Sequence, residues 1–536
     1  MFETLLSGLS LALQGQSLLF LLLGVLIGIW MGAVPGLGGA VGLVLLLPFT
    51  FGMDPVPAFA LLLGSWAAIS TSGAIASVML GIPGTAAAQA TILDGFPLAK
   101  QGHAARAMGA AFTSSAIGGV FGAIMLAVSL PLILPVIRAF QAPETFMLGM
   151  LGLTMVSALS GRTISKGLAA AMLGMLLALI GIPAAQAVPR FTFDTLYLLD
   201  GLPVIPVLLG LFGIPEIMEL AIKRISIARV PETRTEGGGL ADGIKDAIRN
   251  WGLVLRCSVI GTYIGMIPGL GASIVGWVTY GHAIHSSKDS SNFGSGDIRG
   301  VLAPEAANNA LRGGALIPTL SMGIPGSVGT AVLLGALIML GLRPGTAMLT
   351  DNLDVTLSMV WQIALASVLA TTFLYATAGQ LKRVAFIPGD YLVPGVLLFI
   401  FMGAWLGSAS IGDWISCTAF GLLGFLMKRG GWPRPPIVLA LVLGGILEGS
   451  FQISMRIHQG FGWLGRPIVL LLLVVIALSV FTGGRRLKKK NRTESSSKGA
   501  EEAANPVLSL PLSAGLCAVF IWAAVQSLGW PASVRQ

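Results

Sequence analysis

Two short phrases of glycine and proline each occur twice, in the same order, in the two halves of an otherwise apolar sequence. Pro-Gly-Leu-Gly stands at 35–38 and again at 268–271, and Gly-Ile-Pro-Gly stands at 81–84 and again at 323–326. This order indicates an internal duplication. Because proline removes a backbone donor and glycine tolerates positive φ, each phrase predicts a break in a helix. Paired breaks in two apolar halves are typical of the substrate sites of secondary transporters.

The composition suits lipid as the solvent. Hydrophobic residues make up 55% of the chain and charged residues 10%, whereas a soluble chain has roughly 25% charged residues. The sequence predicts an all-α polytopic membrane protein with about 11 to 13 membrane segments, some of them re-entrant hairpins. The clearest apolar runs are 18–34, 107–137, 196–222, 361–381, 392–406, 437–447 and 468–481.

Polar stretches divide the chain into predicted domains. Two related and inverted transmembrane repeats are expected at 18–222 and 251–470, joined by a polar linker at 223–250. The stretch 483–506 is rich in Lys and Arg and then in Ser, Glu and Ala, which predicts a disordered linker on the cytoplasmic side. The uncharged segment 507–528 is long enough to form an extra C-terminal transmembrane helix.

Several function classes lack their motifs in this sequence. No GxxxxGK[ST] is present, so no ATP site is expected, and the absence of GxSxG and HExxH argues against an intramembrane enzyme. Cys257, Cys417 and Cys517 are isolated, so neither a disulfide framework nor a metal site is indicated. The basic runs stand beside membrane segments, which favours membrane topology over nucleic-acid binding as their role.

The helix breaks supply candidate substrate contacts. Lipid does not tolerate broken backbone, whereas a cavity does, and the N–H groups of a restarting helix suit a carboxylate. Purely structural hairpins are the alternative, and the glycines at 24, 28, 32, 261 and 265 are interpreted as helix-packing positions. The predicted substrate-binding residues at the breaks are Gly36, Gly38, Pro83, Gly84, Thr85, Gly269, Gly271, Pro325, Gly326 and Ser327.

The most polar intramembrane phrase is Pro-Glu-Ala-Ala-Asn-Asn at 304–309. A carboxylate and two amides beside apolar sequence are costly unless they are used. Glu305, Asn308 and Asn309 are therefore predicted to couple transport to Na⁺ or H⁺, and both asparagines to bind substrate, with a helix-capping cluster at the membrane edge as the alternative. No other cofactor is expected.

Two further acidic residues receive structural interpretations. Glu448 lies in an otherwise apolar run and is expected to pair with Arg456. Asp94 and the glycine after it follow the first hairpin and are expected to end a helix.

Together these phrases resemble the large transmembrane subunit (TctA family) of the tripartite tricarboxylate transporters. The resemblance extends over residues 18 to 470 and is carried by 32–39, 81–109, 265–271, 304–345 and 443–448. The chain departs from the family in having Thr-Ser-Gly-Ala at 71–74, where Tyr-Gly-Gly-Ser is usual. This difference bears on the substrate and not on the fold.

The resemblance implies cation-driven symport of tricarboxylates or related organic carboxylates across the bacterial inner membrane. It also implies two partners, a periplasmic solute-binding protein (TctC-like) that delivers the substrate and a small membrane subunit (TctB-like). The alternative is a stand-alone carboxylate carrier or channel that needs no binding protein.

Overall fold

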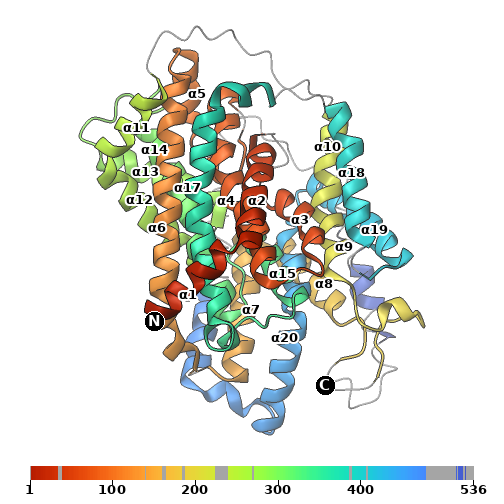
Figure 1. The fold of residues 1–536 in the computed structure, drawn as a ribbon. Helices are drawn as coiled ribbons and strands as arrows, with labels where there is room; N and C mark the ends of the chain where they lie inside the picture. The colour runs from red at the N-terminus through yellow and green to blue at the C-terminus, as the bar shows by residue number, and fades with distance from the viewer. Residues whose placement is uncertain are drawn as a thin grey trace, which may run out of the picture. The chain divides into compact units, whose positions relative to one another are not determined.

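The structure, a computed structural model, is almost entirely helical in the part of the chain that it describes (Figure 1). The described residues are 2–33, 39–81, 83–138, 140–159, 164–183, 188–223, 239–267, 271–384, 389–405 and 408–478, with 513, 515, 517–522 and 525–526 near the C-terminus. Within these ranges the β-type pairing is confined to one isolated bridge between Gly181 and Arg190. The predicted all-α membrane fold is confirmed.

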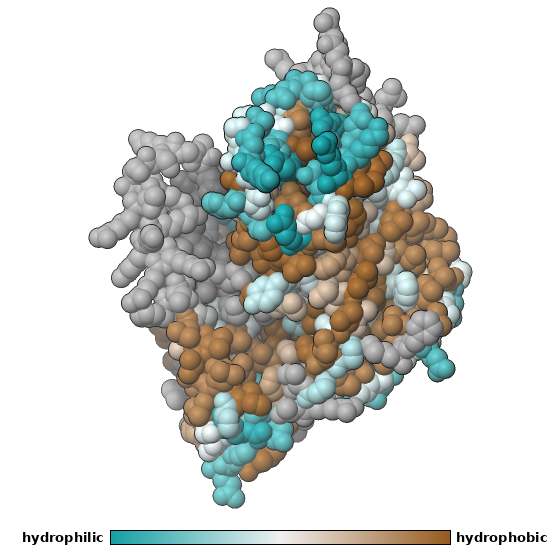
Figure 2. Space-filling view, turned by 90° about the vertical axis from the view of Figure 1, so that its left-hand side faces the viewer, coloured by the Kyte–Doolittle hydropathy of each residue, from teal (hydrophilic) through white to brown (hydrophobic). Residues whose placement is uncertain are grey.

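Five described helices are long and apolar enough to cross a membrane: Gly15–Ala33, Pro55–Met79, Ala104–Pro135, Leu353–Thr377 and Pro435–Ile457. Shorter apolar helices accompany them, at Glu3–Leu13, Ala40–Thr50, Ser165–Ala178, Trp251–Met266, Val328–Met339, Val393–Trp405 and Pro467–Leu478. Figure 2 shows a face on which apolar side chains cover most of the coloured surface and hydrophilic ones gather in separate clusters. Such a surface is suited to lipid contact.

The predicted runs coincide with helices except at 196–222. There a 3₁₀ turn, η3 (Leu196–Leu198), is followed by Gly-Leu-Pro, and continuous helix begins only at Val204. The predicted linker 483–506 lies outside the described residues, as does much of 507–528. Residues 240–249 of the predicted linker 223–250 form helix α11 (Leu240–Arg249), whose small residues Gly243 and Ala247 are buried.

The chain divides into two compact units, each built from segments of both predicted halves. Unit 1 comprises Met1–Ile137 and Glu216–Phe399, and unit 2 comprises Arg138–Pro215 and Ile400–Gln536. The division into repeats at 18–222 and 251–470 stays a prediction, because the units follow spatial contacts and not the repeated phrases.

The elements that lie wholly or mostly in unit 1 are α1 (Phe2–Leu13), α2 (Gly15–Ala33), α3 (Ala40–Leu46), η1 (Leu47–Thr50), α4 (Pro55–Leu80), η2 (Ala86–Gln89), α5 (Ile92–Lys100), α6 (Ala104–Arg138), α10 (Ile214–Lys223), α11, α12 (Trp251–Met266), α13 (Gly271–Ser286), α14 (Arg299–Met322), α15 (Val328–Met339), α16 (Thr346–Leu349), α17 (Leu353–Val384) and α18 (Gly389–Trp405). The elements of unit 2 are α7 (Ala142–Leu159), α8 (Ile164–Ala178), η3, α9 (Val204–Leu208), η4 (Leu209–Gly213), α19 (Ile411–Arg429), α20 (Pro435–Ile457) and η5 (Phe461–Gly465).

Glycine lines two helix seams of unit 1. A Cβ added at Gly28 of α2 would lie 2.7 Å from the Cα of Ser65 on α4. The seam between α12 and α14 is built alike, because a Cβ at Gly265 would lie 2.9 Å from the backbone nitrogen of Ala315. Small residues at a spacing of four let two backbones approach closely. The packing interpretation is confirmed for the ladder positions Gly24, Gly28, Gly32, Gly261 and Gly265.

We expect Gly265→Ala to destabilise unit 1 by about 1–3 kcal/mol, because the new methyl group has no space against the α14 backbone. The matched control is Gly252→Ala on the same helix, where no atom lies within 4 Å of the added Cβ. Alanine there is expected to leave stability unchanged or to raise it slightly. Thermal unfolding of the purified protein in detergent measures both, and equal midpoints for the two variants would contradict the seam.

The segments after the two hairpins pack against the opposite half of the chain. η2, which follows the first hairpin, lies against α13 and α14, while α15, which follows the second, lies against α3 and α4. In the same way α17 lies against α4, and α6 lies against α14, where a Cβ at Gly122 would be 2.6 Å from the Ala310 carbonyl oxygen. Segments of the two halves therefore pack on each other directly after both hairpins, within one compact unit.

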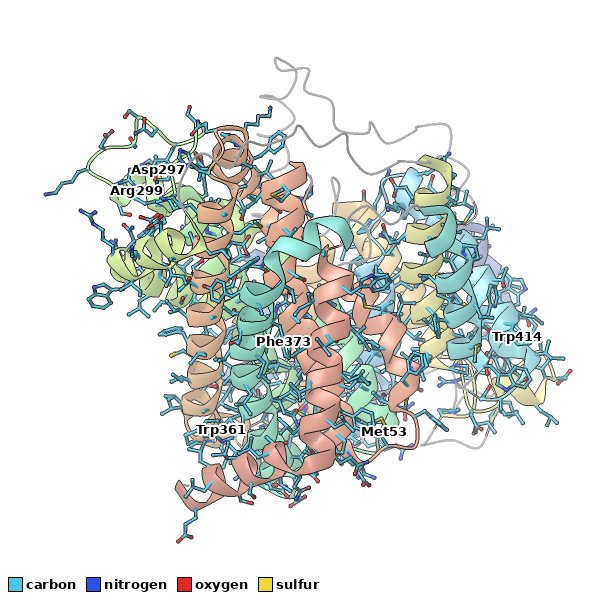
Figure 3. The ribbon with its side chains drawn as sticks, turned by 45° about the horizontal axis from the view of Figure 1, so that its top comes forward. Met53, Asp297, Arg299, Trp361, Phe373 and Trp414 are labelled. Atoms are coloured by element: carbon cyan, nitrogen blue, oxygen red, sulfur yellow. The ribbon has the colours of Figure 1, made fainter. Side chains whose placement is uncertain are left out.

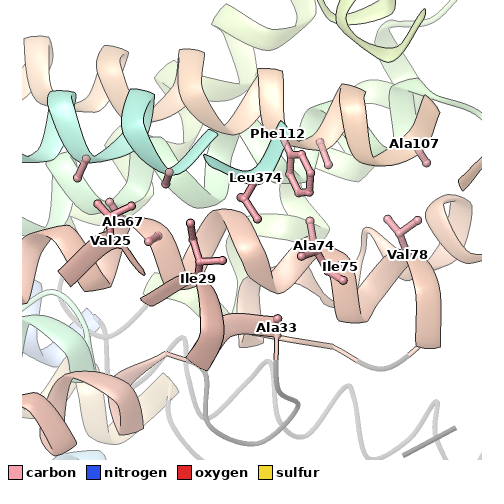
Figure 4. Packing of buried hydrophobic residues seen from close by; sticks show 14 of the residues in the cluster. Val25, Ile29, Ala33, Ala67, Ala74, Ile75, Val78, Ala107, Phe112 and Leu374 are labelled. Atoms are coloured by element: carbon pink, nitrogen blue, oxygen red, sulfur yellow. The ribbon is translucent and has the colours of Figure 1, made fainter. Parts of the chain in front are cut away.

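The core between α2, α4, α6 and α17 consists of small and branched apolar side chains (Figure 4). Val25 and Ile29 of α2, Ile75 of α4, Phe112 of α6 and Leu374 of α17 belong to one buried cluster, in which Val25 lies beside Ala67 of α4 (Figure 4). Because lipid is as apolar as these side chains, their association gains mainly from close van der Waals packing. That packing sets the position of α4, which ends at the first hairpin.

Unit 2 contains α7 and α8 packed on α20, with ion pairs that tie its connections to the helices. Arg466 pairs with buried Glu144 at 2.6 Å, and Arg190 pairs with Glu448 at 2.8 Å. The predicted partner of Glu448 was wrong. Arg456 is exposed and stands eight residues along α20, about 12 Å away at the helical rise. Arg190 forms the isolated bridge with Gly181 and lies beside the carboxylate.

Candidate functional site

Both Gly-Ile-Pro-Gly phrases end a long helix in the same way. α4 ends at Gly81 and α14 ends at Gly323, and both glycines are left-handed, with φ of 65° and 69°. Left-handed glycine closes a helix C-terminus, and a proline two residues later prevents its continuation. The two helices therefore end with the same backbone geometry at Gly81 and Gly323.

Close approach of backbone explains the last glycine of each phrase. A Cβ at Gly84 would lie 2.6 Å from the Cα of Gly73 on α4, and a Cβ at Gly326 would lie 2.6 Å from the carbonyl oxygen of Gly265 on α12. Gly84, Pro325 and Gly326 are buried, whereas Pro83 is exposed. Each hairpin thus folds back directly on a neighbouring helix.

The other breaks are described only at their edges. α2 ends at Ala33 and α3 begins at Ala40, while α12 ends at Met266 and α13 begins at Gly271. The described residues that border the phrases are not helical, because Gly39 before α3 has a φ of 70° and Ile267 after α12 is extended, with φ −87° and ψ 114°. The predicted site residues Gly36, Gly38 and Gly269 lie outside the described residues.

Thr85 and Ser327 occupy corresponding positions but differ in their hydrogen bonds. The Ser327 hydroxyl caps α15 by accepting from the Thr330 backbone nitrogen at 3.3 Å, and the Ser327 nitrogen donates to the Thr330 hydroxyl at 2.8 Å. The Thr85 hydroxyl is buried and has no partner among the described residues. Ser327 therefore holds a helix end, while Thr85 keeps a hydroxyl available to a ligand.

A row of polar side chains crosses the middle of α14. Glu305, Asn308, Asn309 and Arg312 are buried, with exposed fractions of 0%, 1%, 1% and 6%. Spacings of three and four residues place them on neighbouring positions of one side of the helix. Glu305 stands six residues after the helix start at Arg299, so a capping cluster at the helix end does not describe this row.

Two members of the row bond to the first half of the chain. Glu305 accepts from the Thr91 hydroxyl at 2.7 Å and from the Ser115 hydroxyl at 3.4 Å. The Asn309 side-chain oxygen accepts from Thr71 of α4 at 3.2 Å. These hydroxyls come from α4, from the turn before α5 and from α6, so oxygen atoms from four segments meet at Glu305 and Asn309.

The other two members have donors and acceptors without partners. Neither the oxygen nor the nitrogen of the Asn308 amide has a hydrogen-bond partner in the described part of the chain. The Arg312 guanidinium lies over the ring of Trp66 at 4.6 Å from its centroid, and its buried Nε lacks an acceptor there. Buried polar groups are nearly always bonded, so such orphans indicate a ligand or water.

Sequence reasoning did not find Arg312, nor its contact Trp66. One signal was present, because Arg312 is the one basic residue between Arg299 and Arg343, three residues after the polar phrase at 304–309. An ionisable residue inside a membrane segment is a functional candidate by default. The hydroxyl contacts from Thr71, Thr91 and Ser115 gave no such signal, because only tertiary packing brings them to α14.

Asp94 ties a loop of the second half to the first. It does not end a helix as predicted, but is the third residue of α5. Its buried Oδ1 accepts from the backbone nitrogens of Gly294, Gly296 and Asp297 at 2.8–2.9 Å, and Oδ2 accepts from the Tyr280 hydroxyl at 2.8 Å. The carboxylate thereby fixes the turn before α14.

The next charged pair in this loop is Asp297 and Arg299, which Figure 3 labels at one end of unit 1, away from Trp361 and Met53. Arg299 Nη2 and Asp297 Oδ2 are 2.5 Å apart. This hydrogen bond to Asp297 raises the pKa of the Arg299 guanidinium, which therefore stays charged at the start of α14.

We expect Asp94→Ala to lower the free energy of unfolding by about 3–6 kcal/mol, because three backbone donors and a tyrosine hydroxyl lose a charged acceptor. Asp94→Asn is the matched control. Its amide oxygen can still accept from the three backbone groups, so we expect a smaller loss. Chemical denaturation in detergent compares them, and equal losses for both variants would show that the bonds do not hold the loop.

Residues 18–439 match the family described as the tripartite tricarboxylate transporter TctA family. One relative, an uncharacterized 52.8 kDa protein in the TAR-I ttuC' 3'region of Agrobacterium vitis, is 29% identical over 479 residues, covering 87% of this chain and 93% of the relative. A second, an uncharacterized protein in the TAR-II ttuC' 3'region of the same organism, is 29% identical over 200 residues, covering 37% and 83%. No solved structure matches.

The matched region contains both hairpins, the polar row of α14 and the Asp94 contacts. It covers more than three quarters of the chain and begins within α2. The chain belongs to the tripartite tricarboxylate transporter TctA family.

Proposed function

We propose that this chain is the translocating subunit of a binding-protein-dependent symporter in the bacterial inner membrane. Its substrates are tricarboxylates or related organic carboxylates, and its coupling ion is Na⁺ or H⁺. The observation that carries the proposal is the buried polar row of α14, in which Asn308 and Arg312 have hydrogen-bonding atoms without partners. Burying polar side chains without hydrogen-bond partners inside a membrane protein is costly in free energy, and such side chains commonly mark a binding site.

The two hairpins support a substrate site beside this row. Broken backbone is stable in a membrane only where it is buried in protein or lines a cavity. Gly84 and Gly326 are buried, and the segments after them pack against the opposite half of the chain. In this proposal Pro83, Gly84, Thr85, Pro325, Gly326 and Ser327 line the substrate path, with Gly36, Gly38, Gly269 and Gly271 completing it.

Glu305 and its neighbours support a role in ion coupling. The carboxyl group meets the hydroxyls of Thr91 and Ser115, and Asn309 brings an amide oxygen that bonds Thr71. Carboxylates, hydroxyls and amide oxygens are the ligands that hard cations prefer. The same carboxyl group is also suited to carry a proton. Asn308 and Asn309 then link the ion to the substrate one helical turn away.

The family supports the partners in this proposal. A tripartite system has a small membrane subunit and a periplasmic solute-binding protein besides the large subunit, and the chain matches the large subunit family over residues 18–439.

Proteoliposomes test the proposal. The chain is reconstituted with its small subunit, and uptake of labelled citrate and of other di- and tricarboxylates is followed with and without a Na⁺ or pH gradient. Each condition is repeated with and without the binding protein. We expect gradient-driven uptake only when the binding protein is present. Uptake without it would favour the stand-alone carrier, and no carboxylate transport under any condition would overturn the proposal.

A further inference from the structure

We propose that α14 and α15 form a two-point receptor for an acid with at least two carboxylates. Arg312 and Asn308 bind one carboxylate, the free N–H groups at the start of α15 bind another, and the Trp66 ring lies between the two points. The inference rests on the proposed carboxylate transport and specifies its substrate class. A monocarboxylate reaches only one of the two points, so the receptor selects against it.

Arg312 is the first point. Its guanidinium is buried and carries five N–H donors, and within the described residues it makes no hydrogen bond or ion pair. Stacking on Trp66 at 4.6 Å orients its plane but satisfies none of these donors. Glu305 does not neutralise it directly, because that carboxyl group is two helical turns away and accepts from Thr91 and Ser115. A planar fork of this kind fits a carboxylate with two parallel hydrogen bonds.

Asn308 strengthens the first point. It stands one turn before Arg312 on α14, so their side chains are neighbours on the helix surface. Its amide is 1% exposed, and both its oxygen and its nitrogen are unpartnered within the described structure. The nitrogen is therefore free to donate to a carboxylate that Arg312 holds, and the oxygen is free to accept from a substrate hydroxyl.

The second point is the N-terminus of α15, a helix of twelve residues. Ser327 caps Thr330, but the backbone N–H groups of Val328 and Gly329 have no acceptor among the described residues. Such groups carry the positive end of the helix dipole and bind anions. They lie next to the same indole, because a Cβ at Gly329 would be 2.8 Å from Trp66 Nε1.

Direct binding to the full-length chain in lipid nanodiscs tests the first point. The probe is radiolabelled citrate, displaced by unlabelled citrate, succinate or butyrate. Wild type is expected to release label to citrate and succinate but not to butyrate. Arg312→Gln should weaken citrate binding by about a hundredfold and Arg312→Lys by about tenfold, since lysine keeps the charge but lacks the fork. Arg256→Gln removes an exposed charge as the control and should bind as wild type.

Val328→Pro tests the second point without disturbing the helix. Proline is favoured at the first helical position, and the extended Ser327 before it (φ −153°, ψ 170°) is compatible with it. The change removes one free N–H, so we expect citrate binding roughly tenfold weaker and a smaller preference for succinate over butyrate. Ile411→Pro is the matched control, because Ile411 follows the Ser410 cap of α19 in the same way and is exposed.

The outcomes distinguish failure of the proposed carboxylate transport from failure of the two-point receptor. If wild type binds none of the three acids, the proposed function and this inference fall together. If wild type binds citrate while Arg312→Gln and Val328→Pro bind it equally well, the receptor is wrong and carboxylate binding stands. Size-exclusion profiles exclude misfolding of Arg312→Gln. If that variant does not fold, Val328→Pro with wild-type affinity and selectivity still overturns the receptor.

Discussion

Substrate uptake by a Gly84→Leu variant is expected to fall by on the order of a hundredfold or more, with the protein still inserted in the membrane. The physical reason is the fit of the first hairpin on its own helix. An added Cβ would lie 2.6 Å from the Gly73 Cα, so a leucine side chain moves the hairpin away from α4. η2 then loses its packing contacts with α13 and α14, and the Thr85 hydroxyl is displaced from its buried position.

Gly326→Leu is expected to have the same effect at the second hairpin, where the Cβ would lie 2.6 Å from the Gly265 carbonyl oxygen. The control is Gly252→Leu, which introduces the same side chain where no atom lies within 4 Å of the Cβ. Uptake is measured in proteoliposomes at equal protein content. Normal uptake by both hairpin variants would contradict a role of the hairpins in the substrate path.

A Glu305→Gln variant is expected to lose the Na⁺ or pH dependence of uptake. Glutamine keeps an oxygen that accepts from Thr91, and its amide can donate to the Ser115 oxygen, so the packing around α14 is preserved while the charge is removed. A coupling cation that exchanges a charged ligand for a neutral one loses about 1.5–3 kcal/mol. Gradient-driven uptake should then fall by roughly 10- to 100-fold, whereas exchange without a gradient should fall less.

The matched control for this variant is Glu144→Gln. Glu144 is also fully buried, but it pairs with Arg466 in unit 2. That variant is expected to lose stability without changing the ion dependence. Initial rates at a series of Na⁺ concentrations and pH values compare the two. An ion dependence of Glu305→Gln equal to that of wild type would assign Glu305 to structure.

The hairpins illustrate how far local sequence reaches. Glycine and proline at 81–84 and 323–326 predict helix ends, and both helices do end at left-handed glycines. The row at 304–309 is polar in apolar surroundings, and its members are buried. In each case the prediction depends on a free-energy cost that the local sequence reveals. For the hairpins it is the backbone donor that proline removes, and for the row it is the burial of polar side chains.

Predictions that needed a partner from elsewhere in the chain did not succeed. Glu448 pairs with Arg190 and not with Arg456. Asp94 does not end a helix but accepts hydrogen bonds from a loop 200 residues away in the sequence. Hydrophobic periodicity and secondary-structure propensity contain no information about which distant segment packs against a given side chain. For the same reason sequence reasoning missed Arg312, whose significance appears only with its Trp66 contact and its missing hydrogen bonds.

By itself the sequence determined that this chain is a helical membrane protein with helix breaks at repeated positions. The reason is that the need to satisfy backbone hydrogen bonds in lipid, and the effects of proline and glycine on the backbone, depend on each residue and its near neighbours. The sequence also determined the family, through phrases that the family model matches over residues 18–439. Only the tertiary structure decided that the segments after the hairpins pack on the opposite half of the chain. It also decided that Glu305 and Asn309 accept hydrogen bonds while Asn308 and Arg312 have buried atoms without partners among the described residues. Those outcomes depend on distances between segments remote in sequence, which the packing of glycine seams fixes.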